Sequence, residues 1–255
     1  MRNVLHTVLL VWISLSSLLA QNHTNKDHLF NQPDTLTWYD ESRQRVIPVA
    51  IYHPDKEVKS GIQKLVIMNH GYNQNEGTPY LGYSFLAEFL AHHGYLIISI
   101  QHELAGDSLI PSTGIPQIVR RPFWDRGADN IYFVINKLKE QNKGIRYASI
   151  TLIGHSIGGD MVALFPEKYH GIADKIITLD NRRMPLPRTK HPGIYSLRSC
   201  DLPADEGVLP NAEEQKKYGM KIIKLLHTKH NDMCDVATKT QQKEIQEYIL
   251  KFLKD

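Results

Sequence analysis

Residues 150–159, ITLIGHSIGG, contain the most specific motif in the sequence. Ser149–Ile153 reads as a strand, Ile157–Tyr169 has a helical pattern, and G-x-S-x-G places Ser156 at the turn between them. A serine at such a turn stands on strained backbone with its hydroxyl clear of the sheet, and the flanking glycines let neighbouring elements approach closely. We therefore predict that Ser156 is a nucleophile. The alternative interpretation is an ordinary glycine-rich turn.

Short apolar runs alternate with helical patterns on both sides of this turn. Further strand-like runs are Lys64–Asn69, Tyr95–Ile100, Lys175–Leu179, Gly193–Leu197 and Lys221–Leu226. Further helical patterns are Ser84–His93, Asp129–Lys139 and a C-terminal stretch with Ile245, Tyr248, Ile249, Phe252 and Leu253 on one face. This alternation predicts an α/β fold with a mainly parallel central sheet flanked by helices. The β-rich runs Thr35–Asp40 and Arg45–His53 predict an antiparallel N-terminal hairpin.

The first twenty residues predict a signal peptide. Arg2 supplies a positive charge, and the mostly apolar Val4–Leu19 is short for a membrane-spanning helix. A membrane anchor or a buried N-terminal helix is the alternative. Residues 21–34 are polar and predict a linker, and residues 35–255 predict one α/β domain. We expect a secreted or periplasmic protein without stable membrane insertion after cleavage.

The composition is ordinary for a globular enzyme or binding protein, with 42% hydrophobic and 22% charged residues. The net charge of +3 is too small to indicate a nucleic-acid partner. No repeat or low-complexity tract is present, and the composition does not indicate an oligomeric state.

A second motif, His70-Gly71-Tyr72-Asn73, directly follows the predicted strand Lys64–Asn69. In folds with a nucleophile turn, the loop after the third strand supplies one oxyanion donor, and the residue after the nucleophile supplies the other. The predicted donors are therefore the backbone N–H groups of Tyr72 and Ile157, and the Tyr72 ring could line an acyl pocket. The alternative is a common strand-end turn with a packed tyrosine.

Two histidines follow the last strand-like run, and either could be the general base. The base of such a site lies in the loop after the last strand, and we choose His230 over His227 because it lies deeper in that loop. His227, His230, Asp232 and Asp235 could also be read together as metal ligands. Their spacing matches no strong zinc pattern, so we do not expect metal catalysis at these residues.

Four segments now support a resemblance to a known family. They are Met68–His102, Leu152–Ala163, Ile176–Pro187 and Lys224–Asp235. In these segments the chain resembles α/β-hydrolases related to platelet-activating-factor acetylhydrolases and, more distantly, chlorophyllases and cutinase-like polyesterases. The resemblance implies a Ser-His-Asp triad that hydrolyses a small-molecule or lipid-like ester without a metal or an organic cofactor. The acetylhydrolases have an aromatic residue soon after the acid, where this chain has Asn181-Arg182-Arg183, which weakens the case for a lipid acyl group.

Three aspartates could complete a triad, since a carboxylate must orient the histidine. Asp180 follows Lys175–Leu179 at a spacing from Ser156 similar to that of the acetylhydrolase acid, and it is our preferred acid. Asp201 and Asp205 follow the next strand, where many other α/β-hydrolases place the acid, and both stay open as alternatives. Each of the three could instead cap a turn.

Two further features lie near the predicted site. The long loop Glu103–Trp124 could line a substrate cleft with Trp124, although Trp124 could equally belong to the core. Cys200 and Cys234 lie in loops that should meet near the triad, and an exported protein would favour a disulfide between them. The cutinase-like relatives, which have a disulfide near this histidine, imply the same pairing. Two free thiols are the alternative.

These residues together predict a carboxylic ester hydrolase that works through an acyl-enzyme. A thioesterase, an amidase or a polyester hydrolase would use the same residues. A non-catalytic binding protein on a hydrolase fold would usually lack a triad member, whereas none is missing here. A structural or adhesive protein would show repeats, and the chain has none.

Overall fold

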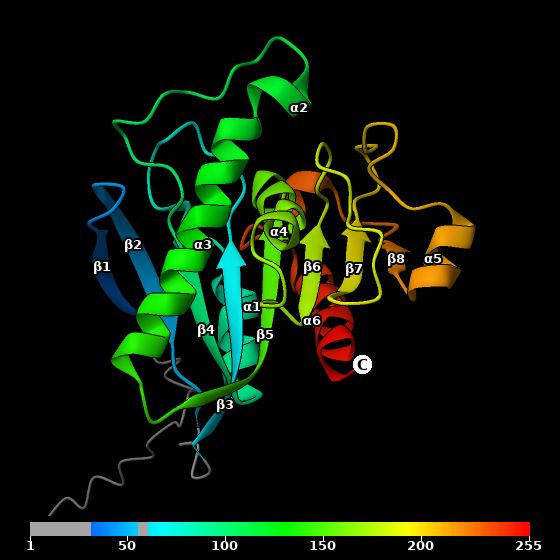
Figure 1. The fold of residues 1–255 in the computed structure, drawn as a ribbon. Coiled ribbons are helices and arrows are strands. Elements are labelled where there is room, and N and C mark those ends of the chain that lie inside the picture. The colour runs from blue at the N-terminus through cyan, green and yellow to red at the C-terminus, as the bar shows by residue number, and fades with distance from the viewer. Residues whose placement is uncertain (1–31, 56–60) are drawn as a thin grey trace, which may run out of the picture. The chain divides into compact units, whose positions relative to one another are not determined.

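A twisted eight-stranded sheet forms the centre of the protein, in the order β1-β2-β4-β3-β5-β6-β7-β8 (Figure 1). The computed structural model describes residues 32–55 and 61–255, and Asn31–Asp255 form one compact unit. The strands are β1 (Asp34–Asp40), β2 (Arg45–Tyr52), β3 (Ile62–Asn69), β4 (Tyr95–Ile100), β5 (Arg146–His155), β6 (Lys175–Leu179), β7 (Gly193–Arg198) and β8 (Lys221–Lys224). The predicted signal peptide and most of the predicted linker lie outside the described residues.

The pairing of the strands confirms the predicted fold class. β1 and β2 form the antiparallel N-terminal hairpin, and β2 is antiparallel to β4. All other neighbours, from β4 through β3 and β5 to β8, pair in parallel. The inner parallel strands are apolar almost throughout because helices cover both of their faces; all six residues of β4, for example, are buried.

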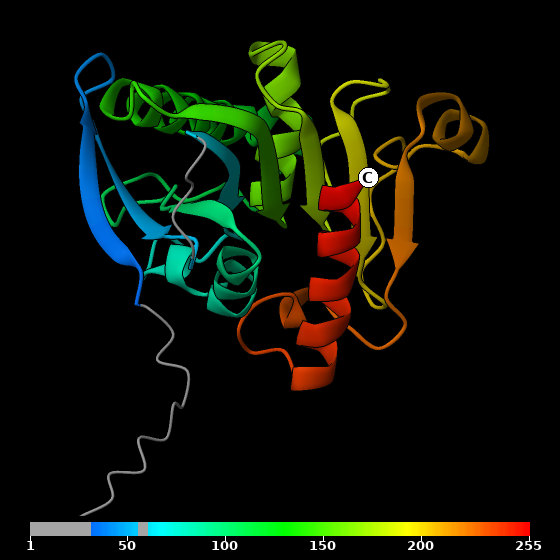
Figure 2. The same cartoon turned by 90° about the horizontal axis from the view of Figure 1, so that it is seen from below.

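Helices cover the two faces of the sheet (Figure 2). They are α1 (Ser84–His92), α2 (Pro116–Val119), α3 (Arg121–Gln141), α4 (Ile157–Lys168), α5 (Ala212–Tyr218) and α6 (Lys239–Lys254). The apolar residues of α3 and α4 pack in one core and those of α1 and α6 in another, so the sheet separates two apolar layers. Among the described residues, none of the helices combines the length and apolarity needed to cross a bilayer.

Two short helices were not predicted from the sequence. α2 is a single turn, and α5 has no buried residue, so neither leaves an apolar stripe in the sequence. α3 begins at Arg121, within the segment that we interpreted as the loop Glu103–Trp124. The irregular part of that connection is therefore shorter than expected, and it ends where Pro116 starts α2.

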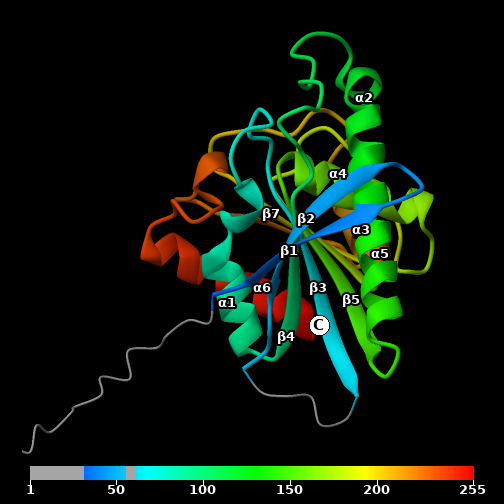
Figure 3. The same ribbon diagram turned by 90° about the vertical axis from the view of Figure 1, so that its left-hand side faces the viewer.

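The topology brings the connections after β3, β4, β5, β6, β7 and β8 to one edge of the sheet, because these strands are parallel. Figure 3 shows the connection between β4 and α3, with α2 at its end, rising above this edge. Every residue predicted for the site except Trp124 and Cys234 lies in the chain within seven residues after one of these strands.

Candidate active site

Ser156 sits on a sharp turn between β5 and α4. Its backbone has φ 53° and ψ −117°, a region that costs a residue with a side chain roughly 1–3 kcal/mol. A hydrogen bond to the sheet keeps Ser156 in this strained conformation: the Ser156 N–H donates to the carbonyl oxygen of Leu179, in β6, at 2.9 Å. The serine hydroxyl is therefore fixed at the carboxyl end of β5.

Two glycines let α4 begin directly behind this turn. A Cβ atom on Gly154 would lie 2.2 Å from the carbonyl oxygen of Gly158, and one on Gly158 would lie 2.3 Å from the carbonyl oxygen of Asn69. Both neighbours are backbone atoms that have no room to move aside. Glycine is required at each position by close approach of the backbone, which is what the G-x-S-x-G pattern indicated.

His230 connects the serine to a carboxylate. It opens the 3₁₀ turn η2 (His230–Asp232) after β8, and it is 8% exposed. Its Nε2 lies 3.0 Å from the Ser156 hydroxyl oxygen, and its Nδ1 lies 2.6 Å from Oδ2 of Asp180. A neutral imidazole with its proton on Nδ1 donates to the carboxylate and accepts from the hydroxyl, which is the arrangement that general-base activation of a serine needs.

Asp180 is fully buried and held by several donors. Its Oδ1 accepts from the Ser199 N–H at 3.0 Å, and its Oδ2 accepts from the Ser199 hydroxyl at 2.7 Å. The guanidinium of Arg198 forms an ion pair with it at 2.9 Å. Burial alone would raise the pKa of Asp180, but these donors, the hydrogen bond from His230 and the positive charge together lower it. Asp180 is thus an anion at neutral pH.

The structure gives the two alternative acids other partners. Asp201 accepts a hydrogen bond from the backbone N–H of His230 at 2.8 Å, so it contacts the main chain of the histidine and not its ring. Asp205 pairs with Arg183 at 3.0 Å. Of the three candidates, Asp180 is the one that the structure brings to the imidazole.

The predicted oxyanion donors lie on both sides of Ser156. A Cβ atom on Gly71 would be 3.4 Å from Cβ of Ser156, so the loop after β3 lies against the nucleophile. Ile157 is the first residue of α4, where N–H groups have no helical acceptor. Neither the Tyr72 N–H nor the Ile157 N–H has a backbone acceptor among the described residues. The Tyr72 hydroxyl accepts from the Ile110 N–H at 3.1 Å, which ties its ring to the β4–α3 connection.

A cavity of about 400 Å³ opens beside this loop. Its lining residues are Gly71, Tyr72, Asn73, Pro79, Gly82, Tyr83, His155, Asn231, Cys234 and Val236. The cavity is therefore bounded by the loop after β3 on one side and by the residues that follow His230 on the other. A small group bound to Ser156 could extend into it.

Sequence analysis missed four residues that hold the site. Arg198 and Ser199 fix Asp180, and a charged residue at the end of a buried strand was the signal that could have revealed Arg198. Tyr83 and His155 were also missed. The Tyr83 hydroxyl lies 2.7 Å from Nδ1 of His155, and Nε2 of His155 lies 3.0 Å from the carbonyl oxygen of His230.

The predicted role of Trp124 in a substrate cleft is wrong. Trp124 lies in the first turn of α3 and is 1% exposed, packed in the core on the α3–α4 face of the sheet. The cause is that α3 begins at Arg121 and carries the tryptophan inward.

The predicted disulfide between Cys200 and Cys234 is also wrong, since both cysteines are free. Their loops do meet, because the Cys200 N–H donates to the Thr228 carbonyl oxygen at 2.9 Å. That contact lies before His230 in the chain. Cys234 follows the turn η2, where its thiol faces the carbonyl oxygen of Asn231 at 3.4 Å, while Cys200 is exposed.

The residues considered as metal ligands have separate tasks. Asp235 accepts from the N–H groups of Ser84 and Phe85 at 3.0 and 2.9 Å and so caps α1. Asp232 accepts from the Lys229 N–H at 3.2 Å. Within residues 32–55 and 61–255, no group of three or more His, Cys, Asp or Glu side chains is placed to hold a metal ion.

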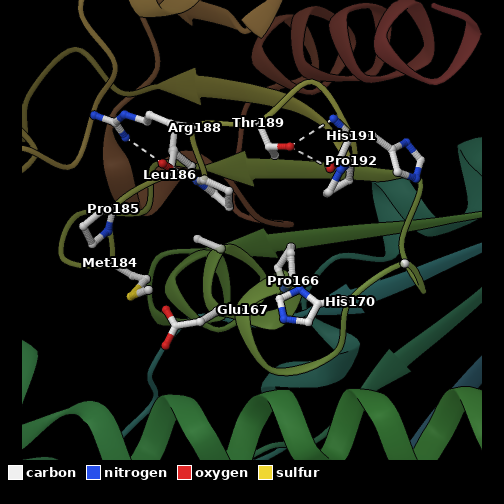
Figure 4. Close-up of a pocket in the computed structure, with 13 residues that line it drawn as sticks. Pro166, Glu167, His170, Met184, Pro185, Leu186, Arg188, Thr189, His191 and Pro192 are labelled. Atoms are coloured by element: carbon white, nitrogen blue, oxygen red, sulfur yellow. Dashed lines mark hydrogen bonds between the residues drawn. The ribbon is translucent and has the colours of Figure 1, made fainter.

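A second concave region lies away from the triad, between α4 and the connection from β6 to β7 (Figure 4). This groove has a volume of about 540 Å³. Its lining residues are Ala163, Pro166, Glu167, His170, Gly171, Met184, Pro185, Leu186, Pro187, Arg188, Thr189, His191 and Pro192. Arg188 faces the surrounding backbone and donates to the carbonyl oxygens of Leu186 and Leu209, so it supports the connection.

No protein-family model matches the chain, and no curated protein sequence is similar enough to count as a relative. Solved structures do resemble it. Esterase 2 of Thermogutta terrifontis, phosphorylated by paraoxon, has a TM-score of 0.61 at 14% identity, over 88% of this chain and 95% of that one. An α/β serine hydrolase without a lid from Xanthomonas campestris has a TM-score of 0.54 at 13% identity, over 87% and 95%. An α/β serine hydrolase homologue from Coxiella burnetii has a TM-score of 0.53 at 14% identity, over 86% and 97%. At such identities the likeness shows the fold alone, which is the predicted α/β-hydrolase fold.

Proposed function

We propose that the protein is a carboxylic ester hydrolase that works through an acyl-enzyme on Ser156. The observation that supports this proposal is the continuous line from the Ser156 hydroxyl through both nitrogens of His230 to Asp180, with distances of 3.0 and 2.6 Å. A serine hydroxyl is a weak nucleophile until a neighbouring base removes its proton, and this line supplies the base and its orienting carboxylate.

In the proposed reaction the Ser156 oxygen attacks the ester carbonyl carbon while Nε2 of His230 takes the hydroxyl proton. The imidazolium that forms is stabilised by the anionic Asp180. The tetrahedral intermediate collapses, the C–O bond to the alcohol breaks, and His230 returns its proton to the departing alcohol. Water then attacks the acyl-enzyme with the same base and releases the acid.

The negative charge that develops on the carbonyl oxygen would be met by the N–H groups of Tyr72 and Ile157. Ile157 also starts α4, so the positive end of the helix dipole points toward the same oxygen. Donors fixed before the reaction stabilise this charge without reorganisation, which is why such sites lower the barrier strongly.

We place the acyl group in the cavity beside Tyr72 and His155. Its volume of about 400 Å³ is ample for a short acyl chain. The Thermogutta terrifontis esterase has been observed with butyrate and propionate bound, which is consistent with short acyl groups on this fold.

Hydrolysis of p-nitrophenyl esters from acetate to palmitate tests this function. We expect turnover that is fastest with acetate to butyrate and that falls about 10⁶-fold in Ser156→Ala, as when other serine hydrolases lose their nucleophile. Ser149→Ala, in the first half of β5 and away from the site, is the matched control and should behave as the wild type. Equal rates in Ser156→Ala and the wild type would refute the proposal. A thioester and an anilide with the same acyl group as the best ester show which acyl derivative the protein prefers.

A further inference from the structure

Tyr83 and His155 join the two halves of the site by a chain of hydrogen bonds. The Gly71 N–H donates to the Tyr83 hydroxyl oxygen at 3.0 Å, and that hydroxyl lies 2.7 Å from Nδ1 of His155. Nε2 of His155 lies 3.0 Å from the carbonyl oxygen of His230. Three contacts therefore connect the loop that precedes Tyr72 with the main chain of His230.

The direction of each hydrogen bond is fixed by its ends. The Gly71 N–H can only donate, so the Tyr83 oxygen accepts it and its O–H is free to donate to Nδ1 of His155. The carbonyl oxygen of His230 can only accept, so Nε2 of His155 must bear the proton. One tautomer of His155 satisfies both neighbours, and every donor in the chain points from the oxyanion loop toward the base.

Neither member of the pair is suited to proton transfer. Burial, together with the nearby His230, lowers the pKa of His155 to about 3. Burial also raises the pKa of Tyr83 far above its usual range. His155 and Tyr83 are both neutral over the pH range in which a His-based hydrolase works, so the chain keeps one arrangement of donors while His230 gains and loses its proton.

At one end, the chain acts on the peptide group just before the one that contains the Tyr72 N–H, because Tyr83 accepts from the Gly71 N–H. The Gly71 N–H is held by Tyr83, and the Gly71 carbonyl oxygen lies 2.7 Å from Nδ1 of His70. Nε2 of His70 accepts from the backbone N–H of His102 at 2.9 Å, so Nδ1 bears the proton and donates. The peptide groups on both sides of the Gly71 Cα atom are therefore held, the first by Tyr83 and the second by His70, and together they set the direction of the Tyr72 N–H.

At the other end, the chain acts on the main chain of His230. The His230 N–H donates to Asp201 at 2.8 Å, and its carbonyl oxygen accepts from His155 at 3.0 Å. Its ring is separately held by Asp180. His155 therefore supplies one of the two clamps on the backbone that carries the base.

Tight packing keeps the pair in place. A Cβ atom on Gly71 would lie 2.9 Å from Nδ1 of His155, and the rings of His155 and His230 are 4.8 Å apart between centroids. Tyr83 is the residue just before α1, and that helix is capped by Asp235, five residues after His230. The Asp235 N–H also donates to the Gly82 carbonyl oxygen at 2.9 Å, so the loop that carries the base docks beside Tyr83.

We propose that Tyr83 and His155 are positioning residues that set the oxyanion peptide and the general base relative to each other. This inference rests on the proposed ester hydrolase function. Transition-state stabilisation needs both parts at once: the base must meet the serine proton while the Tyr72 N–H meets the carbonyl oxygen. A displacement of about 1 Å between such groups can cost about 10²-fold in rate.

Tyr83→Phe tests the pair with the least disturbance, because it removes one oxygen and keeps the ring. We expect kcat for a p-nitrophenyl ester to fall about 10- to 100-fold. KM should stay within about 3-fold, since the ring that lines the cavity is kept and the hydroxyl acts through other residues. Tyr80→Phe is the matched control. It is buried in the same apolar layer and its hydroxyl has no hydrogen bond to a described residue, so its kcat should stay that of the wild type.

His155 variants separate hydrogen bonding from packing. Glutamine can accept from Tyr83 and donate to the His230 carbonyl oxygen, whereas leucine can do neither. We expect His155→Gln to retain at least about 10-fold more of the wild-type kcat than His155→Leu. Equal losses in these two variants would mean that only the volume of the side chain matters, and would overturn the inference.

A double-mutant cycle closes the test. If Tyr83 acts through His155, adding Tyr83→Phe to His155→Leu should lower kcat/KM little further, whereas independent effects would multiply. If the losses in the two single variants multiply in the double variant, or if Tyr83→Phe has the kcat of the wild type, the positioning role is overturned. The proposed function still stands in that case, provided that turnover by the wild type depends on Ser156. Absence of Ser156-dependent turnover in the wild type would overturn both.

Discussion

Nδ1 of His230 lies 2.6 Å from Oδ2 of Asp180, and the two residues are 50 positions apart in the chain. The same carboxylate is held by Ser199 and Arg198, so it cannot turn away from the ring. We expect Asp180→Asn to keep the fold and to lower kcat about 10⁴-fold, because an amide beside Nδ1 favours the wrong tautomer of the imidazole. Steady-state kinetics on a short-chain ester measures this loss.

Asp201→Asn and Asp205→Asn are the matched controls for this prediction. Asparagine at 201 can still accept the His230 N–H, so its loss should stay within about 10-fold. Asp205→Asn should change kcat by less than about 3-fold, because it affects a partly exposed ion pair. A loss in Asp201→Asn as large as that in Asp180→Asn would assign the acid differently.

The close approach behind Ser156 predicts a specific intolerance. Gly158→Ala places a Cβ atom 2.3 Å from the Asn69 carbonyl oxygen, and neither backbone can give way. We expect a loss of at least about 3 kcal/mol in the free energy of unfolding, measured by urea denaturation. Gly144→Ala is the control, since a Cβ atom there meets nothing within 4 Å. Similar stabilities for the two variants would contradict the packing described for the turn.

Glu103 predicts how stability depends on pH. It is 1% exposed, it accepts from the Asn73 N–H at 3.4 Å, and burial raises its pKa to about 7. The nearby Asp107 also raises this pKa, while Arg126 and Arg45 oppose the shift. The pKa of Glu103 in the folded protein exceeds its ordinary value of 4.5. Its contribution to the free energy of unfolding is therefore fully present below about pH 4.5 and is lost as the pH rises to about 7.

The free energy of unfolding that is lost on ionisation of Glu103 amounts to about 3 kcal/mol at most. Glu103→Gln cannot ionise, so it should not show this loss. Thermal denaturation from pH 5 to 8 therefore separates the variant from the wild type: the Tm of the wild type falls relative to that of Glu103→Gln as the pH rises. Glu206→Gln, at an exposed position, should follow the wild type. Parallel Tm curves for the wild type and Glu103→Gln would show that Glu103 does not titrate in this range.

The free cysteines predict the outcome of thiol titration. The native, unreduced protein should contain two titratable thiols. Cys200 should react quickly because it is exposed, and Cys234 slowly because burial raises the pKa of its thiol. A reductant should leave the Tm unchanged. Zero thiols, or a Tm that falls on reduction, would restore the disulfide that the sequence suggested.

The fold could be predicted from the sequence because its signals are local. Continuous apolar strands such as Lys175–Leu179 and the G-x-S-x-G turn each bear their pattern within a few residues, and their order along the chain determines a parallel sheet. α5 could not be predicted in the same way, because its residues bury no apolar face. The start of α3 was predicted too far along the chain, because Arg120 and Arg121 interrupt the apolar pattern from which a helix is recognised.

The residues of the site could be predicted only where a motif or the order along the chain leaves few candidates of the required type. Ser156 and His230 follow from motif and order, but three aspartates remained for the acid because a loop carboxylate has no local signature. Asp180 was favoured by its spacing, and the structure places it at the ring. Tyr83 and His155 could not be found, since their task depends on contacts across 72 positions of the chain.

The same limit explains the two wrong predictions. The loops of Cys200 and Cys234 do approach each other, as expected, but a disulfide depends on the distance between the two side chains, and the sequence does not determine that distance. Trp124 was assigned to a cleft because it followed a long connection, and only the position of the α3 axis shows that its ring enters the core.

The central claim is that Ser156 is the activated nucleophile. It is tested most directly by treating the native protein with paraoxon, which phosphorylates the Thermogutta terrifontis esterase, and locating the label by mass spectrometry of the digested protein. We predict one diethylphosphoryl group per chain, on Ser156, and none on Ser156→Ala. An unlabelled wild-type protein, or a label on another residue that persists in Ser156→Ala, would contradict the claim.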